Sequence, residues 1–243
     1  MDDLTEKIKQ FAKDKGACLV GIASPDKLSN APESWKPWNL LPNVKSLISV
    51  AVKLNRTTIF QLPKTLKEYR LNYDLVNSKL NNLVWEISCF LEKEGYEAIP
   101  IPASTPFDGK KSMGDISHKH VAVAAGLGKF GLNNLVLTPK YGPYVRFATV
   151  LTSVSLNPDK PLNLDICLRE ECLECIKICP VKALDNPVYN PVEGWRINKE
   201  KCYHYLFKVL GLGVCGLCIK VCPIPKQKVN FKFLSKRYAK FLS

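Results

Sequence analysis

Apolar and polar residues follow two different periodicities along the first 160 residues. Apolar residues recur every three or four positions, the spacing of a helix face, in three segments: 3–15, 64–94 and about 115–125. Other segments are short and mainly apolar, which is typical of buried strands: 17–23, 46–54, 97–102, 133–138 and 145–154. This mixture of helices and strands predicts an α+β fold built on an α/β unit.

The pattern changes near residue 160, where proline, cysteine and short apolar pieces replace the longer periodic segments. Bound metal can hold such a segment together with little hydrophobic core. We therefore expect three parts: an α/β domain for cofactor and substrate at 1–160, a cysteine-rich domain at 161–225, and a basic amphipathic tail at 226–243.

Cysteines are distributed very unevenly, and eight of the ten lie between residues 167 and 222. They form two runs that both end in C-x2-C-x3-C-P: Cys167, Cys172, Cys175 and Cys179, then Cys202, Cys215, Cys218 and Cys222. In the bacterial two-cluster pattern, the cysteine before the proline binds the other cluster. The spacing therefore predicts two [4Fe-4S] clusters, one held by Cys167, Cys172, Cys175 and Cys222 and the other by Cys179, Cys202, Cys215 and Cys218.

Two structural zinc sites are the alternative, because zinc also binds C-x2-C pairs. The two C-P endings, and eight cysteines that leave none over, favour the iron–sulfur interpretation. Cys167 lies two residues farther from Cys172 than the usual spacing, so it is the least regular ligand. Outside the runs, Cys18 and Cys89 fall in apolar surroundings, and we expect both to be buried structural thiols.

Composition narrows the class of protein further. The 243 residues are 46% hydrophobic and 23% charged, values typical of a chain that buries a core, and no apolar run predicts a membrane span. The first residues are polar and lack the apolar segment of a secretory signal. Because clustered cysteines in a chain that is not exported usually hold metal, we expect a cytoplasmic protein with no membrane partner.

Positive charge is concentrated at the end of the chain. The net charge is +13, and no acidic residue follows Glu200. Such a basic segment is suited to tRNA or to another acidic partner. An alternative is that the apolar face of the tail docks on the protein itself, through Leu234, Tyr238, Phe241 and Leu242.

A Gly-rich turn matches the spacing G-x-G-x-x-G at Gly126, Gly128 and Gly131. A dinucleotide site needs a strand before this spacing, a helix after it, and an acidic residue about 20 positions later. Here the preceding segment is predicted to be a helix and the following one a strand, so the pattern argues against dinucleotide binding. The glycines still indicate a close approach, either to another strand or to a flat cofactor.

The densest polar cluster of the first domain surrounds two histidines, His118 and His120. On a helix, Asp115 and His118 share a face, so Asp115 could orient His118 as a proton donor or as a cofactor contact. The alternative is a solvated start of a helix with Asp115 as its N-cap. Both interpretations remain open from the sequence.

Several segments resemble a known family, the epoxyqueuosine reductases and reductive dehalogenases. Residues 17–24 are similar to the first strand of that family, and residues 42–49 to its second strand. The Gly-rich turn in 124–131, the continuation at 141–146 and the two cysteine runs also resemble it.

The resemblance implies a nitroreductase-like α/β domain followed by a two-cluster module like that of bacterial ferredoxins. It also implies that two [4Fe-4S] clusters pass low-potential single electrons to cobalamin, bound in its base-off form, while an acidic residue supplies a proton to the reduced substrate. On this basis the candidate catalytic residues are Asp115 and His118, and the candidate cofactor-binding residues are Gly126, Gly128, Gly131 and Tyr141. A ferredoxin or flavodoxin would be the electron donor.

Three functions remain open from the sequence. The first is a corrinoid-dependent reductase of the epoxyqueuosine reductase type, acting on tRNA or on another substrate. The second is an electron-transfer protein or reductive activator of a separate corrinoid protein, which needs no cofactor pocket in the first domain. The third is a flavin-binding relative, because the expected domain resembles nitroreductases.

Overall fold

A four-stranded sheet forms the centre of the computed structural model, which describes residues 2–104, 114–190 and 194–224. The strand order is β1-β2-β6-β3, and every neighbouring pair is antiparallel. The strands are β1 (Leu19–Ala23), β2 (Ser46–Lys53), β6 (Val145–Thr152) and β3 (Ala98–Ile101). The two central strands, β2 and β6, pair along their full lengths, from Ser46 opposite Thr152 to Lys53 opposite Val145.

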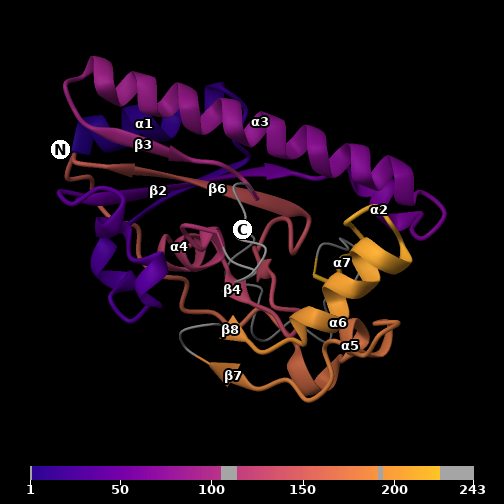
Figure 1. The fold of residues 1–243 in the computed structure, drawn as a ribbon. Coiled ribbons are helices and arrows are strands. Elements are labelled where there is room, and N and C mark those ends of the chain that lie inside the picture. Colours follow the sequence, from indigo (N-terminus) through magenta and orange to yellow (C-terminus); the bar gives the residue numbers. More distant parts are fainter. Residues whose placement is uncertain (1, 105–113, 191–193, 225–243) are drawn as a thin grey trace.

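Helices cover both faces of this sheet, as Figure 1 shows. On one face lie α1 (Asp2–Asp14) and the long helix α3 (Leu66–Lys93), and on the other lies α4 (His118–Ala124). This explains why β2 is buried almost throughout: five of its eight residues are apolar and seven are buried, because neither face of the strand meets water. The main core lies between α3 and the sheet and contains Leu80, Ile87, Ile48 and Val50, all fully buried.

The edge strand β3 is half as long as its neighbour. It pairs only with the segment of β6 from Thr149 to Thr152. Among the described residues, no strand pairs with Val145–Ala148 on that side of β6. The sheet therefore has an open edge next to the end of β3, and the residues at this edge can face a pocket.

Short elements complete the first part of the chain. Helix α2 (Arg56–Phe60) precedes α3, and a small hairpin of β4 (Lys129–Phe130) and β5 (Val136–Leu137) follows α4. Three 3-10 turns lie between β1 and β2: Pro25–Leu28, Glu33–Trp35 and Pro37–Asn39. The Gly-rich turn thus has a helix before it and a strand after it, the order that the sequence predicts.

The cysteine-rich part has no long element among its described residues. It contains a 3-10 turn (Arg169–Glu171), helices α5 (Glu174–Lys177), α6 (Lys199–His204) and α7 (Leu217–Lys220), a π-helical turn (Tyr205–Val209) and the two-residue strands β7 (Tyr189–Asn190) and β8 (Gly194–Trp195). Helix α7 packs on α5 and also on α2, so this part lies against the first. Figure 1 shows it, in orange and yellow, below the end of α3 that adjoins α2.

The predicted mixture of helices and sheet is confirmed, and each predicted helix and strand of the first 160 residues has a counterpart in the structure. The nitroreductase-like and ferredoxin-like descriptions and the division at residue 160 stay predictions. The predicted tail at 226–243 lies outside the described residues. No helix within the described ranges is both long and apolar enough to span a membrane.

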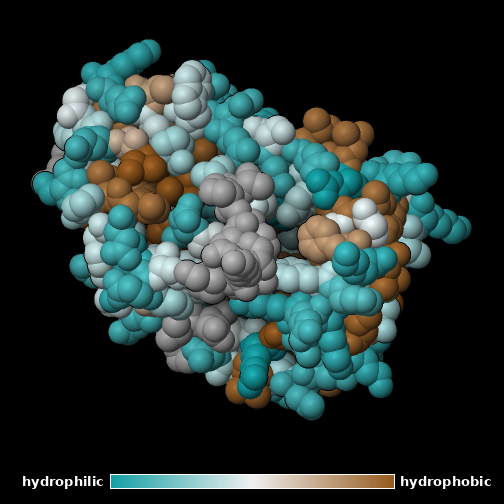
Figure 2. Space-filling view, viewed as in Figure 1, coloured by the Kyte–Doolittle hydropathy of each residue, from teal (hydrophilic) through white to brown (hydrophobic). Residues whose placement is uncertain are grey.

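Most of the surface in Figure 2 is hydrophilic, but hydrophobic residues reach the surface on the right-hand side and at the upper left of this view. Large apolar side chains that are more than half exposed include Leu71 and Leu75 of α3 and Phe207 and Val209 of the π-helical turn.

Candidate functional site

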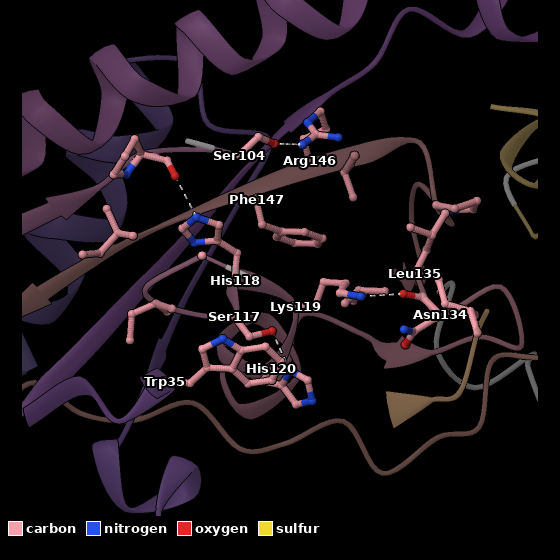
Figure 3. Close-up of a pocket in the computed structure, with 18 of the residues that line it drawn as sticks. Trp35, Ser104, Ser117, His118, Lys119, His120, Asn134, Leu135, Arg146 and Phe147 are labelled. Atoms are coloured by element: carbon pink, nitrogen blue, oxygen red, sulfur yellow. Dashed lines mark hydrogen bonds between the residues drawn. The ribbon is translucent and has the colours of Figure 1, made fainter. Parts of the chain in front are cut away.

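A pocket of about 370 Å³ lies at the open edge of the sheet, a size typical of small-molecule sites. Its wall combines the end of β3, the loop before α4, the start of β6 and residues around α6 and α7. Residues before and after position 160 therefore both contribute to it. Figure 3 shows the side chains that line this pocket.

One part of the pocket wall is apolar and another is polar. The apolar part includes Leu54, Ile101, Leu135, Val145, Phe147 and Ile219. Two buried polar atoms of the wall have no hydrogen-bond partner in the described part of the protein: Nε1 of Trp35, a donor, and Oδ1 of Asn134, an acceptor. Because buried polar groups are nearly always paired, both atoms are available to a ligand.

His118 begins helix α4, and both nitrogens of its ring are engaged. Its Nε2 lies 3.0 Å from the carbonyl oxygen of Pro102, and its Nδ1 lies 2.8 Å from the hydroxyl oxygen of Thr149. A carbonyl only accepts, so Nε2 carries the proton and Nδ1 accepts from Thr149. Burial lowers the pKa of His118 to about 4, which keeps the ring neutral.

Asp115 lies at the pocket, three residues before His118, and is exposed. Its expected orienting contact with His118 is not present, because Pro102 and Thr149 occupy both ring nitrogens. The alternative of Asp115 as N-cap is also not realised, because Ser117 holds that position. The structure thus brings the two candidate catalytic residues to one pocket without linking them.

Lys119 points away from His118 along the pocket wall, toward the loop after β4 (Figure 3). Its Nζ donates a hydrogen bond to the carbonyl oxygen of Asn134 at 3.0 Å and lies 5.8 Å from the centre of the Phe130 ring. Burial and, to a smaller extent, the positive charge of Lys199 lower the pKa of Lys119 to about 8. Two lysines therefore add positive charge to the pocket.

Arg146 of β6 is the residue of this site that sequence reasoning missed. Its guanidinium stacks over the ring of Tyr73, 3.9 Å from the ring centre. Its Nε donates to Oδ1 of Asn77 at 2.6 Å, and its Nη2 donates to the hydroxyl of Ser104. Burial raises the pKa of Tyr73, but the nearby Arg146 charge and hydrogen bonds from Ser104 and Asn77 outweigh it, so the pKa is lowered overall. The sequence signals for Arg146 were its place in the segment 141–146 that resembles the family and its charge inside a mainly apolar strand.

An aromatic stack closes another part of the wall. The ring of His120 lies 5.4 Å from Trp35 and 4.9 Å from Phe130, measured between ring centres. Its Nδ1 is 2.6 Å from the hydroxyl oxygen of Ser117. Helix α4 therefore presents His118 and Lys119 to the pocket with His120 packed between rings (Figure 3).

Four cysteines from both runs line one small cavity beside β5. They are Cys167, Cys172, Cys175 and Cys222. Burial raises the pKa of the Cys222 thiol to about 12, and the proximity of the other three cysteines contributes to this rise. The structure thus brings together the set that the spacing predicts for the first cluster, including the irregular Cys167.

The other four predicted ligands also influence one another. Burial raises the pKa of the Cys218 thiol, and Cys215, Cys175, Cys202 and Cys179 raise it further. Burial likewise raises the pKa of Cys202 to about 11, with Cys179 and Cys215 adding to the effect. Cys179 therefore lies near the second set rather than with its own run. Cys175, a member of the first set, also lies near Cys218 of the second.

The second cysteine set adjoins the pocket. Tyr203 and Ile219 line the pocket, and they directly follow Cys202 and Cys218 in the chain. Within the described ranges, no group of three His, Cys, Asp or Glu side chains could hold a metal ion as placed. The roles of the eight cysteines as ligands therefore stay predictions.

The Gly-rich turn packs against the protein itself. A Cβ atom on Gly126 would lie 2.3 Å from the carbonyl oxygen of Lys160, and one on Gly128 would lie 2.3 Å from that of Leu137. At Gly131, it would lie 2.8 Å from the Leu137 side chain. These three glycines and Tyr141 are not among the residues of the pocket wall. Of the two close approaches that the sequence left open, Gly128 and Gly131 have the one to another strand, β5. A role of the three glycines and Tyr141 in holding a cofactor stays a prediction.

Comparisons with known proteins agree on one group of enzymes, although no family model matches the chain. The chain is 28% identical to the epoxyqueuosine reductase of Bacillus subtilis over 272 aligned positions, covering 93% of this chain and 64% of that protein. It is 27% identical to a tetrachloroethene reductive dehalogenase of Desulfitobacterium hafniense, covering 91% of this chain and 48% of that protein.

Solved structures of these enzymes have a similar fold. A crystal structure of epoxyqueuosine reductase matches with a TM-score of 0.64 at 24% identity, over 93% of this chain and 66% of that one. A catabolic reductive dehalogenase in complex with 3-bromo-4-hydroxybenzoic acid matches with a TM-score of 0.72 at 20% identity, over 93% of this chain and 32% of that one.

These findings define a mixed α/β protein with a pocket beside a cysteine-rich end. The chain is similar in sequence to the epoxyqueuosine reductases and reductive dehalogenases and has a similar fold, as the sequence suggested. It spans 64% of the first of these curated relatives and about half of the second.

Proposed function

We propose that this protein is an iron–sulfur reductase that passes low-potential single electrons through two [4Fe-4S] clusters to a corrinoid bound in the pocket. The observation that carries the proposal is that Tyr203 and Ile219 of the pocket wall directly follow Cys202 and Cys218 of the second cysteine set. Both relatives named above carry out reductive chemistry, and one related structure is described as explaining B12-dependent dehalogenation.

The chemistry of the cysteines fits iron–sulfur clusters. Each set offers four soft thiol ligands, and iron–sulfur clusters are held by four cysteine thiolates. A small cavity whose wall includes Cys167, Cys172, Cys175 and Cys222 leaves space beside the first set. Since Cys175 lies near Cys218, electrons could pass from the first cluster to the second and then to the pocket.

The pocket wall fits a flat, mainly apolar ring whose rim carries amide groups. The apolar residues of the wall suit the ring. Nε1 of Trp35, a donor, suits an amide oxygen, and Oδ1 of Asn134, an acceptor, suits an amide N–H group. When bound there, the corrinoid would supply the reducing metal centre for the reaction. The wall residues would position the substrate beside it and restrict the access of water.

Asp115 is the proposed proton donor. It is an exposed carboxyl group at the pocket, where it can exchange protons with solvent. One structure of the Bacillus subtilis relative is described as having a catalytic aspartate loop swung out of the active site, which supports a carboxyl group in this role. His118 would position the start of α4, because its two ring nitrogens are already bonded within the protein.

The pocket favours this function over the second candidate, an electron-transfer protein or activator with no substrate site of its own. Such a protein needs no cavity of about 370 Å³ in its first domain. A ferredoxin or flavodoxin would supply the electrons. We also propose tRNA as a partner, because one solved relative is in complex with a tRNA stem loop and this chain is basic after Glu200.

Anaerobic purification followed by iron, sulfide, cobalt and flavin analysis of one sample tests the proposal. We expect about eight irons and eight sulfides per chain, which two four-iron clusters require. We also expect binding of added cobalamin and no bound flavin. Stoichiometric flavin with no cobalamin binding would instead support the flavin-binding alternative.

A further inference from the structure

Arg146 is a cation held in the pocket wall by neutral groups. Nε binds Asn77, Nη2 binds Ser104, and the guanidinium plane rests on the ring of Tyr73. These three contacts come from α3 and from the segment that follows β3, so they fix the guanidinium from two sides. The group is therefore preorganised and not free to turn toward solvent.

No carboxylate neutralises this guanidinium in the described part of the chain. Over those residues no ion pair involves Arg146, whereas Arg70, one turn before Asp74 on α3, does pair with that aspartate. A guanidinium has five N–H donors, and the contacts to Asn77 and Ser104 use two of them. A partly buried cation with unused donors is costly unless an anion binds to it.

The surrounding wall is also positive. Lys119 and Lys199 line the same pocket, and among the described residues of its wall the only acidic one is the exposed Asp115. Clefts lined by charge of one sign concentrate ligands of the opposite sign. The pocket is therefore electrostatically suited to an anionic ligand.

We propose that Arg146 binds an oxyanion, a carboxylate or a phosphate group, carried by the ligand of this pocket. The planar fork of a guanidinium matches both groups, and it can make two parallel hydrogen bonds to either. The inference rests on the pocket being the reaction site of the proposed function. The oxyanion belongs either to the substrate or to the phosphate of the corrinoid's nucleotide loop.

Benzoate and inorganic phosphate are the probes, and calorimetric titration of the anaerobically purified protein measures their binding. Arg146→Gln should weaken the binding of both probes about tenfold or more, because a hydrogen bond to a charged group is lost. Arg146→Lys, which keeps the charge but loses the fork, should weaken it by a smaller factor. Arg56→Gln is the matched control, since Arg56 also stacks on a ring, that of Phe60, but lies outside the pocket wall.

Ser104→Ala provides a second variant that keeps the arginine. It removes one of the groups that hold the guanidinium, and we expect about threefold weaker probe binding. Circular dichroism checks that each variant is folded. The proposal is overturned if folded Arg146→Gln binds both probes as tightly as the unaltered protein does.

Titration with cobalamin and with cobinamide, which lacks the nucleotide phosphate, distinguishes the two sources. Weaker cobalamin binding with unchanged cobinamide binding in Arg146→Gln assigns the oxyanion to the corrinoid. If Arg146→Gln binds cobalamin and cobinamide as the unaltered protein does but binds benzoate more weakly, the oxyanion is assigned to the substrate. Because probe binding needs no electron transfer, this inference can hold even if the proposed reductase activity fails.

Discussion

His118 donates a hydrogen bond from Nε2 to the carbonyl oxygen of Pro102, 3.0 Å away. The bond connects the start of α4 to the end of β3, the two elements that form one corner of the pocket. A second bond, from the Thr149 hydroxyl to Nδ1, connects the same ring to β6. His118 therefore determines where α4 begins, and with it the positions of Asp115 and Lys119.

His118→Gln should change how stability depends on pH. The pKa of His118 is about 4 in the folded protein and about 6.5 when unfolded, so the unfolded chain binds more protons between these values. The free energy of unfolding should therefore fall as the pH falls through this window, by about 2 kcal/mol between pH 7.5 and 5. Urea unfolding under anaerobic conditions at the two pH values should show this loss in the unaltered protein and not in His118→Gln.

His204→Gln is the control for that measurement, because His204 is exposed on α6. Its pH dependence should match that of the unaltered protein. An unchanged pH dependence in His118→Gln would mean that the His118 ring is not held neutral by burial.

The charge of Lys119 should control anion binding at alkaline pH. Its pKa of about 8 means that it loses its positive charge above that value. Benzoate keeps its charge over this range, so its affinity should fall between pH 7 and pH 9. Lys199→Gln removes a positive charge that repels the charge of Lys119. The pKa of Lys119 should then rise, and the affinity for benzoate should fall only at higher pH. Lys140→Gln, a lysine over the Tyr141 ring and outside the pocket wall, should leave the profile unchanged.

Single cysteine variants should reveal how the ligands are shared. Cys179→Ala should remove the same cluster signal as Cys215→Ala, and Cys222→Ala the same signal as Cys172→Ala, because each cysteine before a proline lies with the other run. Electron paramagnetic resonance of reduced samples separates the signals, and each variant should lose about four irons. Cys89→Ala should lose none. If Cys179→Ala and Cys172→Ala lose the same signal, the ligands are not exchanged between the runs.

Two glycines separate backbone strain from steric overlap. Gly95 has φ +86°, and a Cβ atom added there would have nothing within 4 Å, so Gly95→Ala should cost about 1–2 kcal/mol from the left-handed conformation alone. Gly126 has φ +72°, and its Cβ would overlap the Lys160 carbonyl, which should add about 1–3 kcal/mol. Equal losses in urea unfolding would show that the Lys160 segment moves away freely.

The sequence predicted the elements well because their patterns are local. The apolar residues of β2 and the repeated leucines of α3 mark the buried positions of a single element, so their spacing can be read within that element's own sequence. Cys167 and Cys222 could be grouped although they are far apart in the chain, because the two-cluster pattern assigns the cysteine before a proline to the cluster of the other run. The same rule placed Cys179 near the second set, where the structure also has it.

The pocket could not be predicted in this way. Arg146 gains its importance from Asn77 and Tyr73, which are about 70 positions earlier in the chain and meet it only across the packed sheet. His118 looked like a proton donor because nothing local shows that Thr149 and Pro102 occupy its ring. The Gly-rich turn was ambiguous for the same reason, since Lys160 and Leu137 fill the space beside it.

Anaerobic titration of the reconstituted protein with cobalamin, followed by absorption spectroscopy, is the decisive experiment for a corrinoid in the pocket. We expect saturable binding at one corrinoid per chain, with a base-off spectrum and reduction of the bound cobalt when a low-potential donor reduces the clusters. Cys215→Ala, which removes a ligand beside the pocket, should abolish that reduction. If the protein keeps both clusters but binds no cobalamin, and its spectrum does not change, the proposed corrinoid-dependent function is wrong.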